Sequence, residues 1–138
     1  MNFLLDTNAV IAILKGNPST VRTRLKEANK KGALIATSSI VMFELWYGVA
    51  RSDRQPENAE RIRVFLSGGI ELLPFDEEDA EAAGELRRAL ELKGKPIGPY
   101  NVLIAAQAIR LGMTLVTANV SEFARVPKLL WQDWSTKS

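Results

Sequence analysis

The chain has 138 residues and a formal net charge of +2, from 18 lysines and arginines against 16 aspartates and glutamates, and it contains no cysteine or histidine. Without these residues, disulfides, thiolate nucleophiles, cysteine-ligated zinc sites and serine–histidine triads are excluded. The composition therefore favours an enzyme that works with carboxylates, with or without a metal ion. The small positive charge permits nucleic acid as a partner but does not argue for it.

The apolar segments do not suggest export or membrane insertion. The apolar start at residues 3–5 is cut by Asp6 and does not resemble a signal peptide, and no apolar run approaches the roughly 20 residues of a membrane span. We expect a cytoplasmic protein without a membrane partner, folded as a single domain over residues 1–138.

Short apolar strands alternate with helices along the chain. The predicted strands are residues 3–5, 34–37, 70–73, 114–117 and 129–131. The predicted helices are residues 10–14, 18–31, 39–51, 56–66, 77–92 and 100–111, with one helical turn at 121–123. Expected N-caps are Asn17, Ser38 or Ser39, and Asp76, and glycines end the helices at Gly16 and Gly112. This alternation predicts an α/β fold with a mainly parallel sheet and a site at the carboxyl ends of its strands.

Acids and amides stand at a few places in otherwise apolar stretches. Asp6 directly follows the first predicted strand in FLLDTNAVIAIL, and Glu44 is the one charge in SIVMFELWYGVA. Asn101 lies near the start of the helix in IGPYNVLIAAQA, and Asn119 follows the strand predicted at 114–117. Because the carboxyl ends of parallel strands share one edge of a sheet, we expect these residues to meet there.

Each of these residues also has an ordinary structural interpretation. Asp6 can cap the first helix, Glu44 can lie on a solvent-facing stripe, and Asn101 can be an N-cap or a first-turn residue. However, an ionised carboxylate in apolar surroundings needs compensation, and a bound cation would compensate both acids. Carboxylates are preferred ligands of Mg²⁺ and Mn²⁺, which can activate water for phosphodiester hydrolysis.

Taken together, four stretches resemble the PIN-domain ribonucleases and, within them, the VapC-type toxins of bacterial toxin–antitoxin pairs. They are FLLDTNAVIAILKG, SSIVMFELWYGVARS, IGPYNVLIAAQA and TLVTANVSEFARVPKL, and the resemblance covers the whole chain. It implies a three-layer α/β/α sandwich with a short parallel sheet. It also implies a Mg²⁺- or Mn²⁺-dependent endoribonuclease that cleaves RNA.

The resemblance also implies roles for individual residues. Asp6 and Glu44 are expected to bind the metal, and Thr117 matches a threonine of the fourth motif that orders the site. Asn119 and Glu122 both fall where members of the family place a further acid, asparagine or glutamate, and the sequence leaves open which of them faces the metal. Thr7 and Asn8, which follow Asp6, are expected to support the site.

Asn101 departs from the family pattern, which has aspartate at this position. An amide has nearly the same shape and its oxygen can coordinate weakly, but it lacks the charge and its NH₂ group presents a donor to the cation. We hypothesise that Asn101, whether natural or engineered, silences the metal site, since a loss of about 3 kcal/mol already costs roughly a hundredfold in rate. The alternative is a PIN-like module that binds RNA or a protein without cutting.

Partner surfaces are the least specific part of the sequence. Most basic residues are expected on solvated helix faces, and Arg51 and Arg54, at the end of the Glu44 helix, are the better candidates for RNA contacts. Trp46 and Tyr47 beside Glu44 suit either an interface or the core. The resemblance implies a homodimer and a VapB-type antitoxin whose C-terminal segment covers the active groove, with an arginine beside Asp6 and Glu44.

Overall fold

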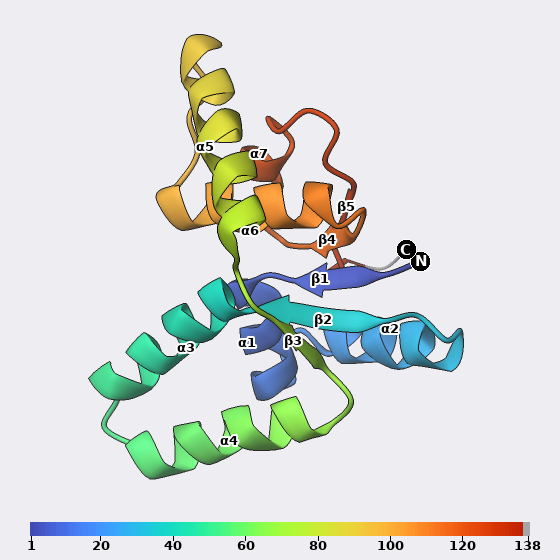
Figure 1. Ribbon diagram of the computed structural model, residues 1–138. Helices are drawn as coiled ribbons and strands as arrows, with labels where there is room; N and C mark the ends of the chain where they lie inside the picture. Colours follow the sequence, from blue (N-terminus) through green and yellow to red (C-terminus); the bar gives the residue numbers. More distant parts are fainter. Residues whose placement is uncertain (137–138) are drawn as a thin grey trace.

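The computed structural model describes residues 1–136, and a parallel sheet runs through its centre (Figure 1). The strand order is β3-β2-β1-β4-β5, and every neighbouring pair is parallel. The strands of the described residues are β1 (Phe3–Leu5), β2 (Ile35–Ser38), β3 (Glu71–Leu73), β4 (Thr114–Val116) and β5 (Trp131–Gln132). The predicted parallel sheet is therefore confirmed.

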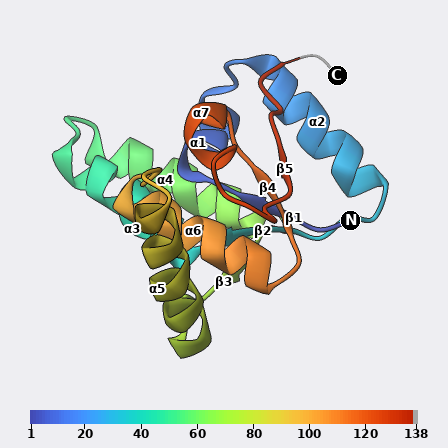
Figure 2. The ribbon, with the colours of Figure 1, turned by 90° about the horizontal axis from the view of Figure 1, so that it is seen from above.

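Helices cover both faces of this sheet. They are α1 (Thr7–Lys15), α2 (Ser19–Lys30), α3 (Ser39–Arg51), α4 (Gln55–Ser67), α5 (Glu77–Leu92), α6 (Pro99–Arg110) and α7 (Val120–Phe123). Figure 2 shows α1 and α2 on one side of the sheet and α5 and α6 on the other, which is the expected three-layer arrangement. Helix α3 packs against α1, α4 and α6. Within residues 1–136, no helix combines the length and the apolar character that crossing a membrane requires.

The central strands form the core because helices cover them on both faces. All residues of β1, β2 and β4 are buried, whereas the edge strands β3 and β5 are partly exposed. This is why the central strands appear as short continuous apolar runs in the sequence. At one end of the sheet, Trp134 packs edge-on against Phe3, with ring centroids 5.1 Å apart.

Several helix ends follow the expected local chemistry. The Oδ1 atom of Asp76 accepts from the backbone N–H of Asp79, and the Asp79 side chain accepts from the N–H of Asp76, which completes a capping box. Gly16 ends α1 with a φ of 67°, a left-handed conformation that glycine adopts without steric cost. Ser38 is the residue that caps α3.

Several predicted boundaries are wrong; the helix predicted at residues 10–14, for example, runs from Thr7 to Lys15. Strand β5 begins at Trp131 rather than at residue 129, because Lys128 has a φ of 68° and the chain is still turning there. Asn17 does not cap α2, because Pro18 itself occupies the extended N-cap position. Of the two structural interpretations of Asn101, the N-cap is wrong, because Gly98 takes that position, and the first-turn residue is confirmed, because α6 begins at Pro99.

Candidate active site

The site lies where the strand order reverses. Strands β1, β2 and β3 follow each other in one direction, and β4 and β5 lie on the opposite side of β1. In parallel α/β sheets the crevice at the carboxyl end of this point is the usual ligand site. Asp6 directly follows β1 and Thr117 directly follows β4, and the backbone N–H of Asp6 donates to the carbonyl of Val116 at 3.1 Å. Both residues therefore border the crevice.

Asp6 is a buried carboxylate, with 4% of its surface exposed. It caps α1, since its Oδ1 atom accepts from the backbone N–H of Ala9 at 2.8 Å, and it also forms a side-chain hydrogen bond with Thr117. Burial raises the pKa of Asp6 to about 6. The negative charges of Glu44 and Asp133 also raise this pKa, whereas the hydrogen bonds with Thr117 and Ala9 lower it. None of the ion pairs found within residues 1–136 involves Asp6. Asp6 is thus both the helix cap and an acid whose charge lacks a protein counter-ion.

Glu44 reaches the same site from α3. Its side chain is half-buried, and its Oε1 atom accepts from the hydroxyl of Thr7 at 2.6 Å. Since Thr7 adjoins Asp6, this bond holds the Glu44 carboxylate close to the buried acid. The solvent-facing alternative for Glu44 is therefore only partly right, because one side of the carboxylate is held within the fold.

Asn101 and Asn119 converge on Glu122. The Nδ2 atoms of Asn101 and Asn119 donate to Oε2 of Glu122 at 3.1 Å and 2.8 Å, and the backbone N–H of Gly98 donates to Oε1 at 2.5 Å. These bonds, that of Asn119 most strongly, hold the pKa of Glu122 below its usual value. In this structure the NH₂ group of Asn101 is therefore occupied by a carboxylate of its own chain.

The remaining predicted residues differ in their relation to the crevice. Thr117 is buried and its hydroxyl accepts from the backbone N–H of Asn119 at 3.0 Å, so it connects Asp6 to the Glu122 corner. Asn8 is exposed and lines a hollow that also contains Asp133. Arg51 lies 5.0 Å above the ring of Tyr47, and Arg54 is exposed just before α4.

Asp133 is a site residue that the sequence analysis missed. It directly follows β5, as Asp6 follows β1, and its charge contributes to the raised pKa of Asp6. Its Oδ1 atom also accepts from the backbone N–H of Ser135 at 2.9 Å, which fixes its position. The signal was present in the sequence, but the strand predicted to end at residue 131 did not place an acid directly after it.

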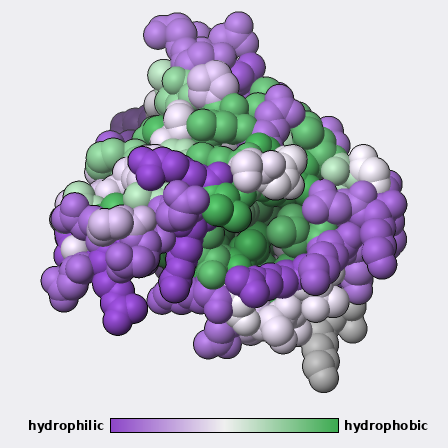
Figure 3. Space-filling model, turned by 90° about the horizontal axis from the view of Figure 1, so that it is seen from below, coloured by the Kyte–Doolittle hydropathy of each residue, from purple (hydrophilic) through white to green (hydrophobic). Residues whose placement is uncertain are grey.

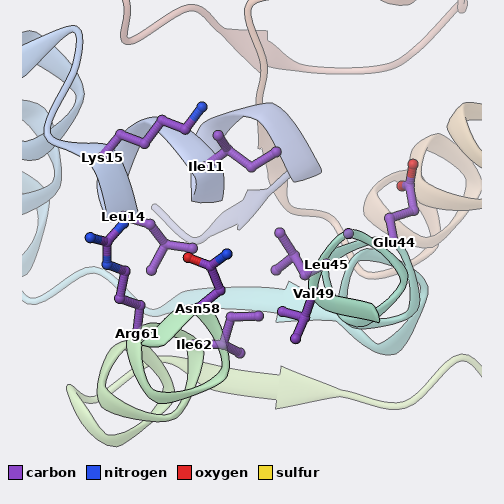
Figure 4. A pocket seen from close by; sticks show the side chains of 10 residues that line it. Ile11, Leu14, Lys15, Glu44, Leu45, Val49, Asn58, Arg61 and Ile62 are labelled. Atoms are coloured by element: carbon purple, nitrogen blue, oxygen red, sulfur yellow. The ribbon is translucent and has the colours of Figure 1, made fainter. Parts of the chain in front are cut away.

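A groove with an apolar floor leads away from Glu44. It is formed by α1, α3 and α4, with the floor provided by Ile11, Leu14, Leu45, Val49 and Ile62. Figure 4 shows Glu44 at one end of this groove, and Lys15 and Arg61 as positive charges beside the apolar floor. From the side on which α4 lies, Figure 3 shows a hollowed hydrophobic area bordered by hydrophilic side chains. Lys15 and Arg61 therefore border the groove.

The donors in the crevice suit a hard divalent cation, although they are few. Asp6 and Glu44 offer carboxylate oxygens, and the uncompensated charge of Asp6 favours a cation. Within residues 1–136, however, no group of three or more carboxylates is arranged to hold a metal ion. The residues therefore fit a site with two carboxylates, in which Asn101 does not provide a third charge.

Comparison with known proteins identifies the fold family. The model of the PIN domain family matches residues 3–129. The chain belongs to the PIN-domain family. This PIN domain is 40% identical over 134 residues to ribonuclease VapC2 of Rickettsia felis. The aligned residues cover 97% of this chain and 98% of the relative. It is 36% identical to the tRNA(fMet)-specific endonuclease VapC of Salmonella typhimurium, with the same coverage.

Solved structures agree with these relatives. The PIN domain matches a chain of VapBC2 from Rickettsia felis, bound to a promoter DNA fragment, with a TM-score of 0.90, 38% identity, and 97% and 99% coverage of the two chains. It matches a chain of DNA-bound VapBC from Salmonella typhimurium with a TM-score of 0.88, 35% identity, and 97% and 98% coverage. The resemblance inferred from the four stretches is thereby confirmed.

Proposed function

We propose that this PIN domain is a metal-dependent endoribonuclease of the VapC type whose activity is weakened by Asn101. The observation that carries the proposal is a buried acid without a counter-charge, Asp6, held beside Glu44 at the carboxyl edge of a parallel sheet. The names of the relatives, a ribonuclease and a tRNA-specific endonuclease, support RNA as the substrate.

In this proposal the chain's own residues position the two acids. Thr117 and the backbone of Ala9 orient Asp6, and the hydroxyl of Thr7 orients Glu44. Mg²⁺ or Mn²⁺ held by Asp6 and Glu44, with the amide oxygen of Asn101 as a weak further ligand, supplies Lewis-acid activation of water and charge stabilisation at the scissile phosphate. The burial of Asp6 keeps water away from one side of the acid pair, which strengthens its attraction for a cation.

The experiment compares this chain with its Asn101→Asp variant, using Asp6→Ala as the blank, during titration with Mn²⁺ or Mg²⁺. Transfer RNA is the first substrate, and total RNA is the second. We expect Asn101→Asp to cleave faster by roughly a hundredfold, the equivalent of about 3 kcal/mol, and Asp6→Ala to be inactive. Equal cleavage by the chain and its Asn101→Asp variant would refute the weakening, and metal-independent cleavage would refute the mechanism.

A second candidate function is a PIN-like module that binds RNA without cutting it. The amide at position 101 and the lack of a three-carboxylate group within residues 1–136 favour it. The predicted contacts of Arg51 and Arg54 with RNA belong to both candidates. Under this second function, RNA binding would weaken with salt and with Arg51→Ala, while Asn101→Asp would still release no cleavage products.

We further propose that a VapB-type antitoxin closes the groove between α1, α3 and α4. The apolar floor suits the apolar face of a partner helix, and an arginine of the partner would find the carboxylate of Glu44 at the end of the groove, close to Asp6. The matching structures are of VapBC assemblies, which supports such a partner. Val49→Glu should abolish co-purification with the antitoxin while the variant still unfolds cooperatively, and co-purification that survives this change would exclude the groove.

The predicted homodimer and cytoplasmic location remain predictions. Three aromatic side chains near the site, Phe43, Tyr47 and Tyr100, are exposed by 53%, 55% and 44%, and the rings of Phe43 and Tyr100 lie 5.5 Å apart. This apolar face would suit a second copy of the chain. Light scattering of the wild type and of Phe43→Glu would reveal a dimer that dissociates in the variant, and a monomeric wild type would refute the prediction.

A further inference from the structure

The corner formed by Glu122, Asn101, Asn119 and Gly98 connects two helices through one carboxylate. Glu122 belongs to α7, whereas Gly98 and Asn101 belong to the N-terminal turn of α6. Both oxygens of Glu122 are used, with Oε1 bonded to the backbone of Gly98 and Oε2 bonded to both amides. The carboxylate therefore fixes the start of α6 relative to α7.

The backbone of Gly98 lies in ordinary van der Waals contact with the side chains of this corner. A Cβ atom placed on Gly98 would lie 3.4 Å from Nδ2 of Asn101 and 3.5 Å from Oε1 of Glu122, so the backbone already meets both side chains. The side chain at position 101 cannot easily turn away without losing these contacts. Whether residue 101 presents an N–H donor or a charged oxygen therefore decides whether it attracts or repels the carboxylate of Glu122.

An aspartate at position 101 would have the shape of the asparagine but not its donor. Its second oxygen would take the place of Nδ2, which lies 3.1 Å from Oε2 of Glu122. Two carboxylates at this separation repel each other unless a proton or a cation lies between them. The NH₂ group of Asn101 removes this requirement, because it donates a hydrogen bond across the same gap.

We propose that the amide of Asn101 replaces a cation at this corner, so that α6 and α7 are held together in the metal-free protein. In this view Asn101 and Glu122 are a matched pair of positioning residues. With asparagine in place of aspartate at position 101, the site has one negative charge fewer, but its structure no longer depends on a bound metal ion. The inference extends the proposed function, because it says how the weakened site keeps its shape.

The pairing predicts that a reciprocal exchange is tolerated. In the double variant Asn101→Asp with Glu122→Gln, the oxygen of the introduced glutamine can accept from Gly98, and its NH₂ group can donate to the introduced aspartate. The amide of Asn119 can rotate so that its oxygen accepts from the same NH₂ group. The double variant thus restores a donor opposite an acceptor, whereas Asn101→Asp alone places two acceptors face to face.

The test measures melting temperatures of four proteins in EDTA: the wild type, Asn101→Asp, Glu122→Gln and the double variant. We expect Asn101→Asp to melt lower than the wild type by about 3–6 °C, the shift of an interaction of this kind in a domain of this length. The double variant should melt no lower than Glu122→Gln. The comparison in the Glu122→Gln background is the matched control, because it makes the same change at position 101 without the facing carboxylate.

Two results in EDTA would overturn the inference. One is an Asn101→Asp variant that melts with the wild type, and the other is an equal loss from Asn101→Asp in both backgrounds. Mn²⁺ is then added to separate this inference from the proposed function. A larger rise in melting temperature for Asn101→Asp than for the wild type supports both the metal site and the pairing of Asn101 with Glu122. No rise in any of the four proteins refutes the metal site. The comparison in EDTA then decides by itself whether Asn101 and Glu122 are a matched pair.

Discussion

Two buried aspartates show how differently one fold treats the same side chain. Asp6 and Asp79 are 4% and 0% exposed, and each lies at the start of a helix. Asp79 accepts from Nε of Arg110 at 2.6 Å and from the backbone N–H of Asp76 at 2.9 Å. Asp6 accepts from a backbone N–H and bonds a threonine hydroxyl, but no lysine or arginine pairs with it among residues 1–136.

The difference teaches that burial of an acid is not by itself a sign of function. At Asp79 the protein supplies the cation, since Arg110 also pairs with Asp76 and Glu78, and the cluster fastens α5 to α6. At Asp6 the protein supplies hydrogen bonds and leaves the charge uncompensated. An uncompensated buried charge opposes folding, so its presence is better explained by a ligand than by stability.

The largest loss of stability should follow from removing Arg110, the cation that neutralises Asp79. Arg110→Leu leaves Asp79 buried beside two other acids without a counter-charge, and we expect it to lower the free energy of unfolding more than any other substitution in this comparison. Urea denaturation at neutral pH measures this loss. A loss below about 1 kcal/mol would mean that Asp79 is not dependent on Arg110 and would weaken the comparison.

Replacing Asp6 should have the opposite effect, and raise the free energy of unfolding. With a pKa of 3.8 in the unfolded chain and about 6 in the folded one, Asp6 favours folding while it is protonated, and this advantage is lost as the pH rises through about 6. Asn is an equally good N-cap and does not ionise, so Asp6→Asn should stabilise the metal-free protein at pH 8 by up to about 3 kcal/mol.

Urea denaturation in EDTA between pH 4 and pH 8 tests this sign. The gain from Asp6→Asn should grow with pH and be small near pH 4. Asp79→Asn is the matched control, and it should destabilise the protein because it weakens the bond with Arg110. A gain at Asp6 that does not change with pH would show that desolvation of the carboxylate is not its cause.

A smaller loss of stability is expected from removing the Thr7 hydroxyl, which positions the carboxylate of Glu44. Thr7→Val keeps the shape of the side chain but removes the hydroxyl that donates to Glu44 at 2.6 Å. We expect a loss of about 1–2 kcal/mol, because the acceptor is charged and half-buried. Thr7→Ser, which keeps the hydroxyl, should recover most of this loss, and equal losses from the two variants would rule out the hydrogen bond as the cause.

The smallest effect is expected for ion pairs at the surface. Arg88 lies 3.7 Å from Glu91 on α5, and both side chains are largely exposed to solvent. Water screens such a pair, so Arg88→Ala should change the free energy of unfolding by less than about 0.5 kcal/mol. A loss comparable to that of Arg110→Leu would show that the contrast between compensated and uncompensated acids does not depend on burial.

The sequence by itself determined the features that depend on neighbours along the chain. Capping residues such as Asp76 and the short apolar runs of the strands were readable because their chemistry is local. Asp6 and Glu44 stood out for the same reason, as charges within apolar stretches. Their assignment to one crevice followed from the general geometry of parallel sheets.

The tertiary structure alone decided which groups far apart in the sequence meet. The sequence did not indicate that Arg110 would neutralise Asp79, or that Glu122 would accept from Asn101 across the gap between two helices. Asp133 was missed because the last strand ends one residue later than predicted, at Gln132, which changes the side chain that follows it. Periodicity and capping report a residue's immediate neighbours, whereas the compensation of a buried charge depends on contacts that form only when the helices pack.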